Sequence, residues 1–65
     1  MRRVLFKRYE DVNGRRIWSD FVYEGLFHAW GHEDNGYGSM YSVAIIELPD
    51  GRVETVLPER IKFIS

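Results

Sequence analysis

The chain has 65 residues, of which 45% are hydrophobic, 15% aromatic and 29% charged, with a formal net charge of −1 and no cysteine. So short a chain can build one hydrophobic core, and residues 1–65 are therefore expected to form a single small domain. The absence of cysteine excludes disulfides, cysteine-type zinc sites and a thiol nucleophile.

The first predicted element is a β-hairpin that turns at Asn13-Gly14. Both residues accept a positive φ, which a two-residue type I′ turn requires. With this turn, residues of opposite charge face each other across the two strands, and apolar or aromatic residues face each other as well. Such cross-strand pairs stabilise a hairpin, so they favour the register that this turn sets. The expected pairs are Val12–Arg15, Asp11–Arg16, Tyr9–Trp18, Lys7–Asp20, Phe6–Phe21, Leu5–Val22, Val4–Tyr23 and Arg3–Glu24.

Side-chain alternation along these strands predicts two faces. The expected core face carries Val4, Phe6, Ile17, Phe21 and Tyr23. The opposite face is charged, but it also contains an apolar strip. That strip either covers the hairpin or contacts a second subunit or a ligand, and we expect a homo-oligomer built on it. Its members are Leu5, Tyr9, Trp18 and Val22.

The rest of the chain is predicted to form short strands and turns. Gly25 is expected to break the second strand, after which residues 26–31 resume with Leu26, His28 and Trp30 on one side. A polar, glycine-containing loop is expected over residues 32–38, and Pro49-Asp50-Gly51 predicts a turn. Strands are expected over residues 39–48, 52–57 and 61–64, with one helical turn at residues 58–60. No apolar period typical of an α-helix is present.

The segment from Val43 to Ile64, with its Pro-Asp-Gly turn and its Pro-Glu-Arg helical turn, resembles the SH3-like small β-barrels. The resemblance implies an all-β fold, namely a small five-stranded antiparallel barrel with one helical turn before the last strand. The Trp-Trp pair of peptide-binding SH3 domains is absent. The chain also resembles in general character the very short proteins that phages encode.

Motifs of catalysis and metal binding are not found in the sequence. The P-loop, the dinucleotide-binding glycine pattern and the Gly-x-Ser-x-Gly elbow are all absent, so no catalytic residues are expected. His28 and His32 would stand about 13 Å apart on a strand, too far to share one ion. We therefore expect a protein that is not an enzyme and that uses no metal or cofactor.

Binding is the function that the composition favours. Arginine outnumbers lysine, and the basic residues gather in the first hairpin, whereas acidic residues dominate from residue 17 onward. These basic side chains either pair with carboxylates on a solvated face or form a surface that binds an anionic group. Aromatic side chains beside them could stack on bases or on side chains of a partner. The expected ligand- or partner-binding residues are Tyr9, Arg15, Arg16, Trp18, His28, Trp30 and Tyr37.

Three functions fit these residues. The first is a phage-type interaction or inhibitor module that acts on a host or partner protein. The second is an oligomeric protein that sequesters a small anionic nucleotide used as an immune signal. The third is a small nucleic-acid-binding barrel, which the net charge of −1 disfavours because few counterions would be released.

A targeting segment is not expected. The apolar run Val4-Leu5-Phe6 ends at Lys7, whereas a secretory signal needs roughly 7–15 apolar residues and a membrane span needs about 20. The expected location is the cytoplasm, or the host cytoplasm if a phage encodes the chain.

Overall fold

The structure is a computed structural model that describes residues 1–64, and it is built from β-strands and one 3-10 turn. The expected all-β class is therefore confirmed, as are the positions of the last three strands and of the helical turn. In chain order the elements are β1 (Arg2–Phe6), β2 (Tyr9–Val12), β3 (Arg15–Trp18), β4 (Tyr23–Asp34), β5 (Met40–Glu47), β6 (Val53–Val56), η1 (Pro58–Arg60) and β7 (Ile61–Phe63).

Five strands form one antiparallel sheet in the order β6-β5-β4-β1-β7, and β2 and β3 form a separate two-stranded sheet. Within residues 1–64, β6 and β7 are the two edges of the larger sheet and do not pair with each other. Within that range the sheet does not close on itself, so the expected small barrel is not formed. Lys7 donates its backbone N–H to the carbonyl of Arg60 at 3.0 Å, which ties the end of β1 to η1.

The predicted turn of the first hairpin is confirmed. Asn13 and Gly14 have φ values of 53° and 79°, as a type I′ turn requires. Tyr9 lies opposite Trp18 and Asp11 opposite Arg16, in the expected register.

The predicted register fails further from the turn. Phe6 lies opposite Tyr23, not Phe21, because residues 19–22 form an irregular segment opposite the shorter Lys7-Arg8. The Ser19 N–H still donates a hydrogen bond to the Arg8 carbonyl at 2.8 Å, and beyond this pair the two segments separate. The extra length is two residues, so Tyr23 still points to the side that was predicted.

Two of the expected core residues lie outside the core. Phe21 is half-buried, with the Lys7 ammonium 4.7 Å from its ring centre. Ile17 is 47% exposed, because the hairpin extends beyond the edge of the larger sheet. An alternation pattern gives the face of a residue but not how far the packed core reaches along a strand.

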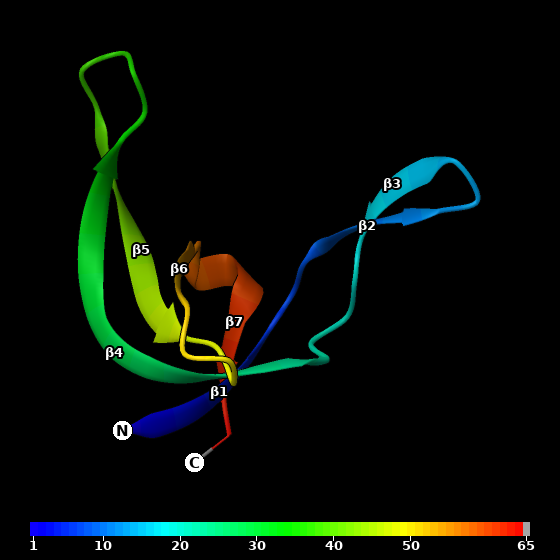
Figure 1. Cartoon of the computed structure of the whole chain (residues 1–65). Helices are drawn as coiled ribbons and strands as arrows, with labels where there is room; N and C mark the ends of the chain where they lie inside the picture. Colours follow the sequence, from blue (N-terminus) through cyan, green and yellow to red (C-terminus); the bar gives the residue numbers. More distant parts are fainter. Residues whose placement is uncertain (65) are drawn as a thin grey trace.

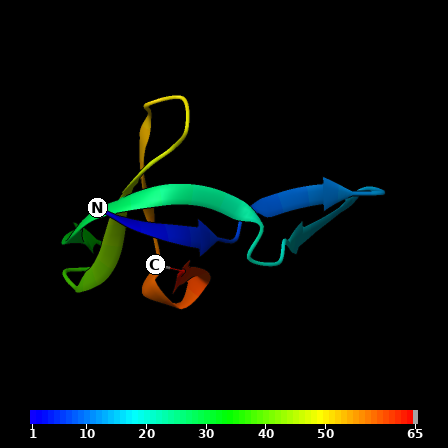
Figure 2. The same cartoon turned by 90° about the horizontal axis from the view of Figure 1, so that it is seen from below.

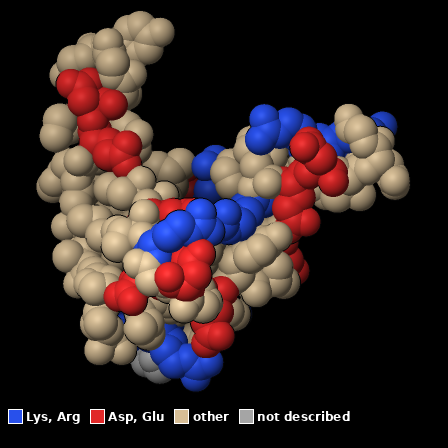
Figure 3. All heavy atoms as spheres, in the orientation of Figure 1, with Lys and Arg blue, Asp and Glu red and all other residues tan. Residues whose placement is uncertain are grey.

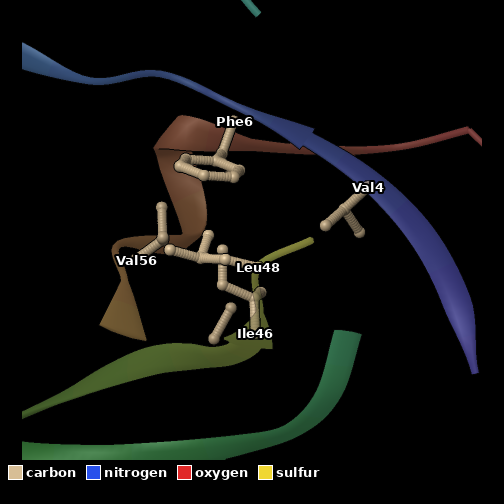
Figure 4. Packing of buried hydrophobic residues seen from close by; sticks show 6 residues of the cluster. Val4, Phe6, Ile46, Leu48 and Val56 are labelled. Carbon is tan, nitrogen blue, oxygen red and sulfur yellow. The ribbon is translucent and has the colours of Figure 1, made fainter. Parts of the chain in front are cut away.

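The core lies between the two halves of the larger sheet (Figure 4). Phe6, Ile46 and Val4 are its largest fully buried side chains. Half-buried aromatic and aliphatic residues surround it. The buried cluster comprises Val4, Phe6, Ala44, Ile46, Leu48 and Val56, and the surrounding residues are Tyr23, Phe27, Ile61 and Phe63.

The expected strand break at Gly25 is wrong, because β4 runs continuously through it. A Cβ at Gly25 would lie 3.2 Å from the backbone carbonyl oxygen of Glu47, so the glycine permits close packing of β4 on β5. The irregularity comes later, where His28 is the extra residue of a bulge between Phe27 and Ala29. The bulge reverses the alternation, so Trp30 shares a side with Phe27 rather than with Leu26 and His28.

Two arms extend from this sheet (Figures 1 and 2). One is the β2–β3 hairpin, and the other is the outer part of the β4–β5 hairpin. The Cα radius of gyration is 12.8 Å, whereas a compact domain of this length would have about 11 Å. The arms account for the excess and leave much of their surface in water.

Candidate functional site

The site begins with two aromatic rings that lie side by side on the β2–β3 hairpin. Asn13-Gly14 fixes the register that places Tyr9 opposite Trp18, and their ring centres are 4.3 Å apart. Tyr9 is 50% exposed and Trp18 is 38% exposed. Rings held this way present contact area without losing much side-chain freedom on binding.

Two guanidinium groups extend the ring pair. The Arg16 guanidinium lies 4.7 Å from the Tyr9 ring centre, and that of Arg60 lies 3.6 Å from the Trp18 ring centre. Arg16 is a neighbour on the same hairpin face, whereas Arg60 comes from η1. We call Tyr9, Trp18, Arg16 and Arg60 the hairpin stack; it joins the arm to the far end of the chain.

A groove of about 230 Å³ runs beside the hairpin stack, between the base of the hairpin, β6 and η1. Its charged residues are Lys7, Arg8, Arg60 and Glu54. Arg8 is neutralised by Glu54 at 2.9 Å, whereas Lys7 and Arg60 form no ion pair within residues 1–64. The groove therefore keeps a positive charge. Its other lining residues are Phe6, Tyr9, Trp18, Thr55, Val56 and Leu57.

Polar contacts hold the hairpin base in place. Tyr23 donates its O–H to the Glu10 carboxylate at 2.7 Å, and this hydrogen bond raises the pKa of the Tyr23 phenol above its usual value of 10.0. The Arg8 N–H donates to Ser19 Oγ at 3.0 Å. These contacts fix the hairpin base, which forms one side of the groove.

The wider depression of about 510 Å³ lies between Tyr23, Leu48 and the Pro49–Arg52 turn. Its two arginines are already paired, Arg8 with Glu54 at 2.9 Å and Arg52 with Asp50 at 2.7 Å. Hydrogen bonds from the backbone and side chain of Arg52 lower the pKa of Asp50. This surface therefore offers less free charge to a ligand than the groove.

The predicted site residues fall into two groups. Tyr9, Arg16 and Trp18 come together on one hairpin face, and Arg15 lies on the same hairpin with its side chain on the opposite face. The other three lie on or at the base of the β4–β5 arm, away from the hairpin (Figure 1). These are His28, which contacts Glu47 at 2.9 Å, Trp30, which is 51% exposed, and Tyr37 in the loop.

Sequence reasoning missed Arg60 and Lys7. Arg60 was assigned to a helical turn, but only the strand order brings that turn beside β1. The sequence predicted the helical turn before the last strand, but it did not show that this turn lies beside the end of β1.

Within residues 1–64, no group of three or more His, Asp or Glu side chains is placed to hold a metal ion. In the same range, no helix has the length and apolar character needed to cross a membrane.

Comparisons of the chain with family models, with curated proteins and with solved structures give no match.

Proposed function

We propose that this chain is a protein-interaction module that binds an extended, acidic segment of a partner protein in the groove beside the hairpin stack. The observation that carries the proposal is the pair of exposed rings between two guanidinium groups, next to a groove with two unpaired cations. Aromatic and arginine side chains dominate the energetics of protein interfaces. A protein that inhibits a host or partner enzyme by covering its surface would need no more than this.

The choice of an acidic segment follows from charge. Lys7 and Arg60 both line the groove, and Arg60 presents several N–H donors in a fixed plane. Carboxylates of a partner would accept these hydrogen bonds. Because the groove is lined by the hairpin base, β6 and η1, a partner chain lying in it would contact all three elements.

A nucleotide is a weaker fit at this place. Tyr9 already contacts Trp18 and Arg16, and Trp18 contacts Tyr9 and Arg60. Each ring therefore already has an aromatic neighbour and a guanidinium neighbour, so a nucleobase would have to displace one of them or use the remaining ring surface. The sequestering function and the nucleic-acid function draw less support from this geometry than the interaction module does.

We also propose that the fold is an open variant of the SH3-like barrels. Two features support this: the tight turn between β5 and β6, and η1 immediately before the short β7. Both lie within residues 43–64, the segment that carries the resemblance.

Selection from a displayed library of random linear peptides tests the function. The unmodified chain should enrich acidic peptides, and Trp18→Ala should weaken binding of an enriched peptide roughly 30-fold, as expected for an interface anchor. Trp30→Ala is the matched control, because it removes the other tryptophan, and it should bind as the unmodified chain does. Enrichment without acidic bias, or equal binding by Trp18→Ala, would contradict the proposal.

A further inference from the structure

The outer part of the β4–β5 hairpin carries apolar side chains that residues 1–64 leave half or more exposed, Trp30 at 51% and Met40 at 64%. We call residues 28–43 the outer arm. β1 pairs with β4 only up to Phe27, and β6 pairs with β5 only from Ala44 onward, so the outer arm is a two-stranded ribbon with free edges. Two-stranded ribbons are marginally stable alone in water.

One face of the outer arm continues the face that forms the core. Trp30 lies opposite the fully buried Ala44, and Asp34 lies opposite Met40 on the same side. Trp30 is 51% exposed and Met40 is 64% exposed. A half-exposed tryptophan and an exposed methionine on the same face as a carboxylate resemble the centre and rim of a protein interface.

The β2–β3 hairpin has a matching uncovered face. The face opposite the hairpin stack carries Val12 and Ile17, both exposed, with Arg15 directly opposite Val12. Arg15 forms no ion pair within residues 1–64. The same face carries Glu10 opposite Ile17, but that carboxylate accepts the Tyr23 O–H, so Arg15 is the charged group left for a partner. The outer-arm face carries Trp30, Met40 and Asp34, with His32 and Ser42 between them.

The outer arm is acidic, whereas β2 and β3 carry Arg15 and Arg16 against Glu10 and Asp11 and have no net charge. Residues 25–51 contain no lysine or arginine, and the outer arm carries Glu33 and Asp34, neither of which forms an ion pair within residues 1–64. Figure 3 shows acidic spheres on the β4–β5 arm and both basic and acidic spheres on the hairpin, with an open space between the two arms. Because the arms of one chain lie apart, each can receive an arm from another molecule (Figure 1).

We propose that two copies of this chain form a two-fold symmetric dimer in which the Val12–Arg15–Ile17 face of each hairpin packs on the Trp30–Asp34–Met40 face of the other copy's outer arm. Two-fold symmetry makes every arm contact occur twice and closes the assembly. Each contact then needs to bury only about 400 Å² per partner to reach a standard interface, against 4743 Å² exposed by one chain. The dimer uses the hairpin face opposite the stack, so it does not rest on the proposed peptide groove.

Paired charge reversals test the dimer. Sedimentation equilibrium should give twice the monomer mass of 7.7 kDa for the unmodified chain. Arg15→Glu alone and Asp34→Lys alone should each weaken the dimer at least about 10-fold, because each places like charges at both contacts. An equimolar mixture of the two variants should dimerise again, since one contact is native and the other has both charges exchanged.

Controls keep the result interpretable. Lys62→Glu reverses an exposed charge on β7, away from both arms, and should leave the dimer unchanged. Asp34 also accepts a hydrogen bond from the Gly36 N–H at 2.7 Å, and Asp34→Asn keeps that acceptor while removing the charge, so it should weaken the dimer without loosening the loop. A monomeric unmodified chain, reversal variants that dimerise normally, or a mixture that stays monomeric would each overturn the proposal.

Discussion

The two arms of this molecule are both two-stranded ribbons, but they are held in different ways. The β2–β3 hairpin is fixed at its base by two hydrogen bonds and a cation–aromatic contact. The hydrogen bonds join Tyr23 to Glu10 and Arg8 to Ser19, and the guanidinium of Arg60 lies over the Trp18 ring. The outer arm is a continuation of β4 and β5, and its base rests on the contacts of Trp30 with Phe27 and Phe63. The difference teaches that the hairpin, fixed at its base, can present the hairpin stack and the groove without rearranging, whereas the outer arm extends beyond the core and offers an exposed tryptophan and methionine.

The largest expected effect is the difference in stability lost when a side chain is truncated in the core of the larger sheet and when one is truncated on an arm. Phe6→Ala removes a fully buried ring and should cost about 3–5 kcal/mol of unfolding free energy, enough to unfold a marginal domain of this size. Ile17→Ala on the hairpin should cost about 0.5 kcal/mol or less when both changes are made in the Arg15→Glu background, which lacks the proposed dimer contact of Ile17. Urea denaturation at equal protein concentration measures both. Similar losses would mean that Ile17 belongs to the core after all.

A second contrast compares two glycines of β4, one at the base of the arm and one within it. Gly25→Ala should destabilise by about 1–3 kcal/mol, because its Cβ would meet the Glu47 carbonyl oxygen at 3.2 Å. Gly31→Ala should cost less, since the nearest atom is the flexible Cδ1 of Ile45 at 3.0 Å. Thermal denaturation of the two variants tests the ranking, and the reverse order would show that β4 and β5 do not approach so closely at Gly25.

The attachment of the hairpin to η1 is open to a double-mutant cycle. Arg60→Ala and Trp18→Ala should show a coupling of about 0.5–1 kcal/mol, the usual strength of an exposed cation–aromatic contact. Arg16→Ala with Trp18→Ala should couple more weakly, because Arg16 contacts Tyr9. No coupling between Arg60 and Trp18 in urea denaturation would mean that the hairpin is not joined to η1 in solution.

The smallest effect is a pH dependence at the hairpin base. The hydrogen bond to Glu10 raises the pKa of Tyr23 in the folded chain, so its stabilisation is present below pH 10.0 and is lost as the pH rises beyond that value. Tyr23→Phe should therefore lose stability at neutral pH and show a flatter alkaline limb in urea titrations. An unchanged alkaline limb would place the Tyr23 hydroxyl away from Glu10.

The comparison of the arms also shows what the sequence could predict. The hairpin turn and the Tyr9–Trp18 pair follow from Asn13-Gly14, because a tight turn fixes register over its nearest residues. The register beyond Tyr9 could not be predicted, because nothing in the sequence of Ser19–Val22 shows that these residues leave the ladder. The bulge at His28 has no turn residue to mark it, and it decides that Trp30 faces the core side. Arg60 lies at the site because β7 pairs with β1 and brings η1 beside the hairpin base, and pairing between strands so far apart in the chain could not be predicted from the sequence.

The most direct test of the proposed binding site uses the two tryptophans, because one lies on the hairpin and the other at the base of the outer arm. Their indole N–H signals can be followed by NMR while an acidic peptide from the display selection is added. We expect the Trp18 signal to move in a saturable way and the Trp30 signal to stay in place. Movement of the Trp30 signal with an unchanged Trp18 signal would place peptide binding on the outer arm and contradict the assignment of the groove.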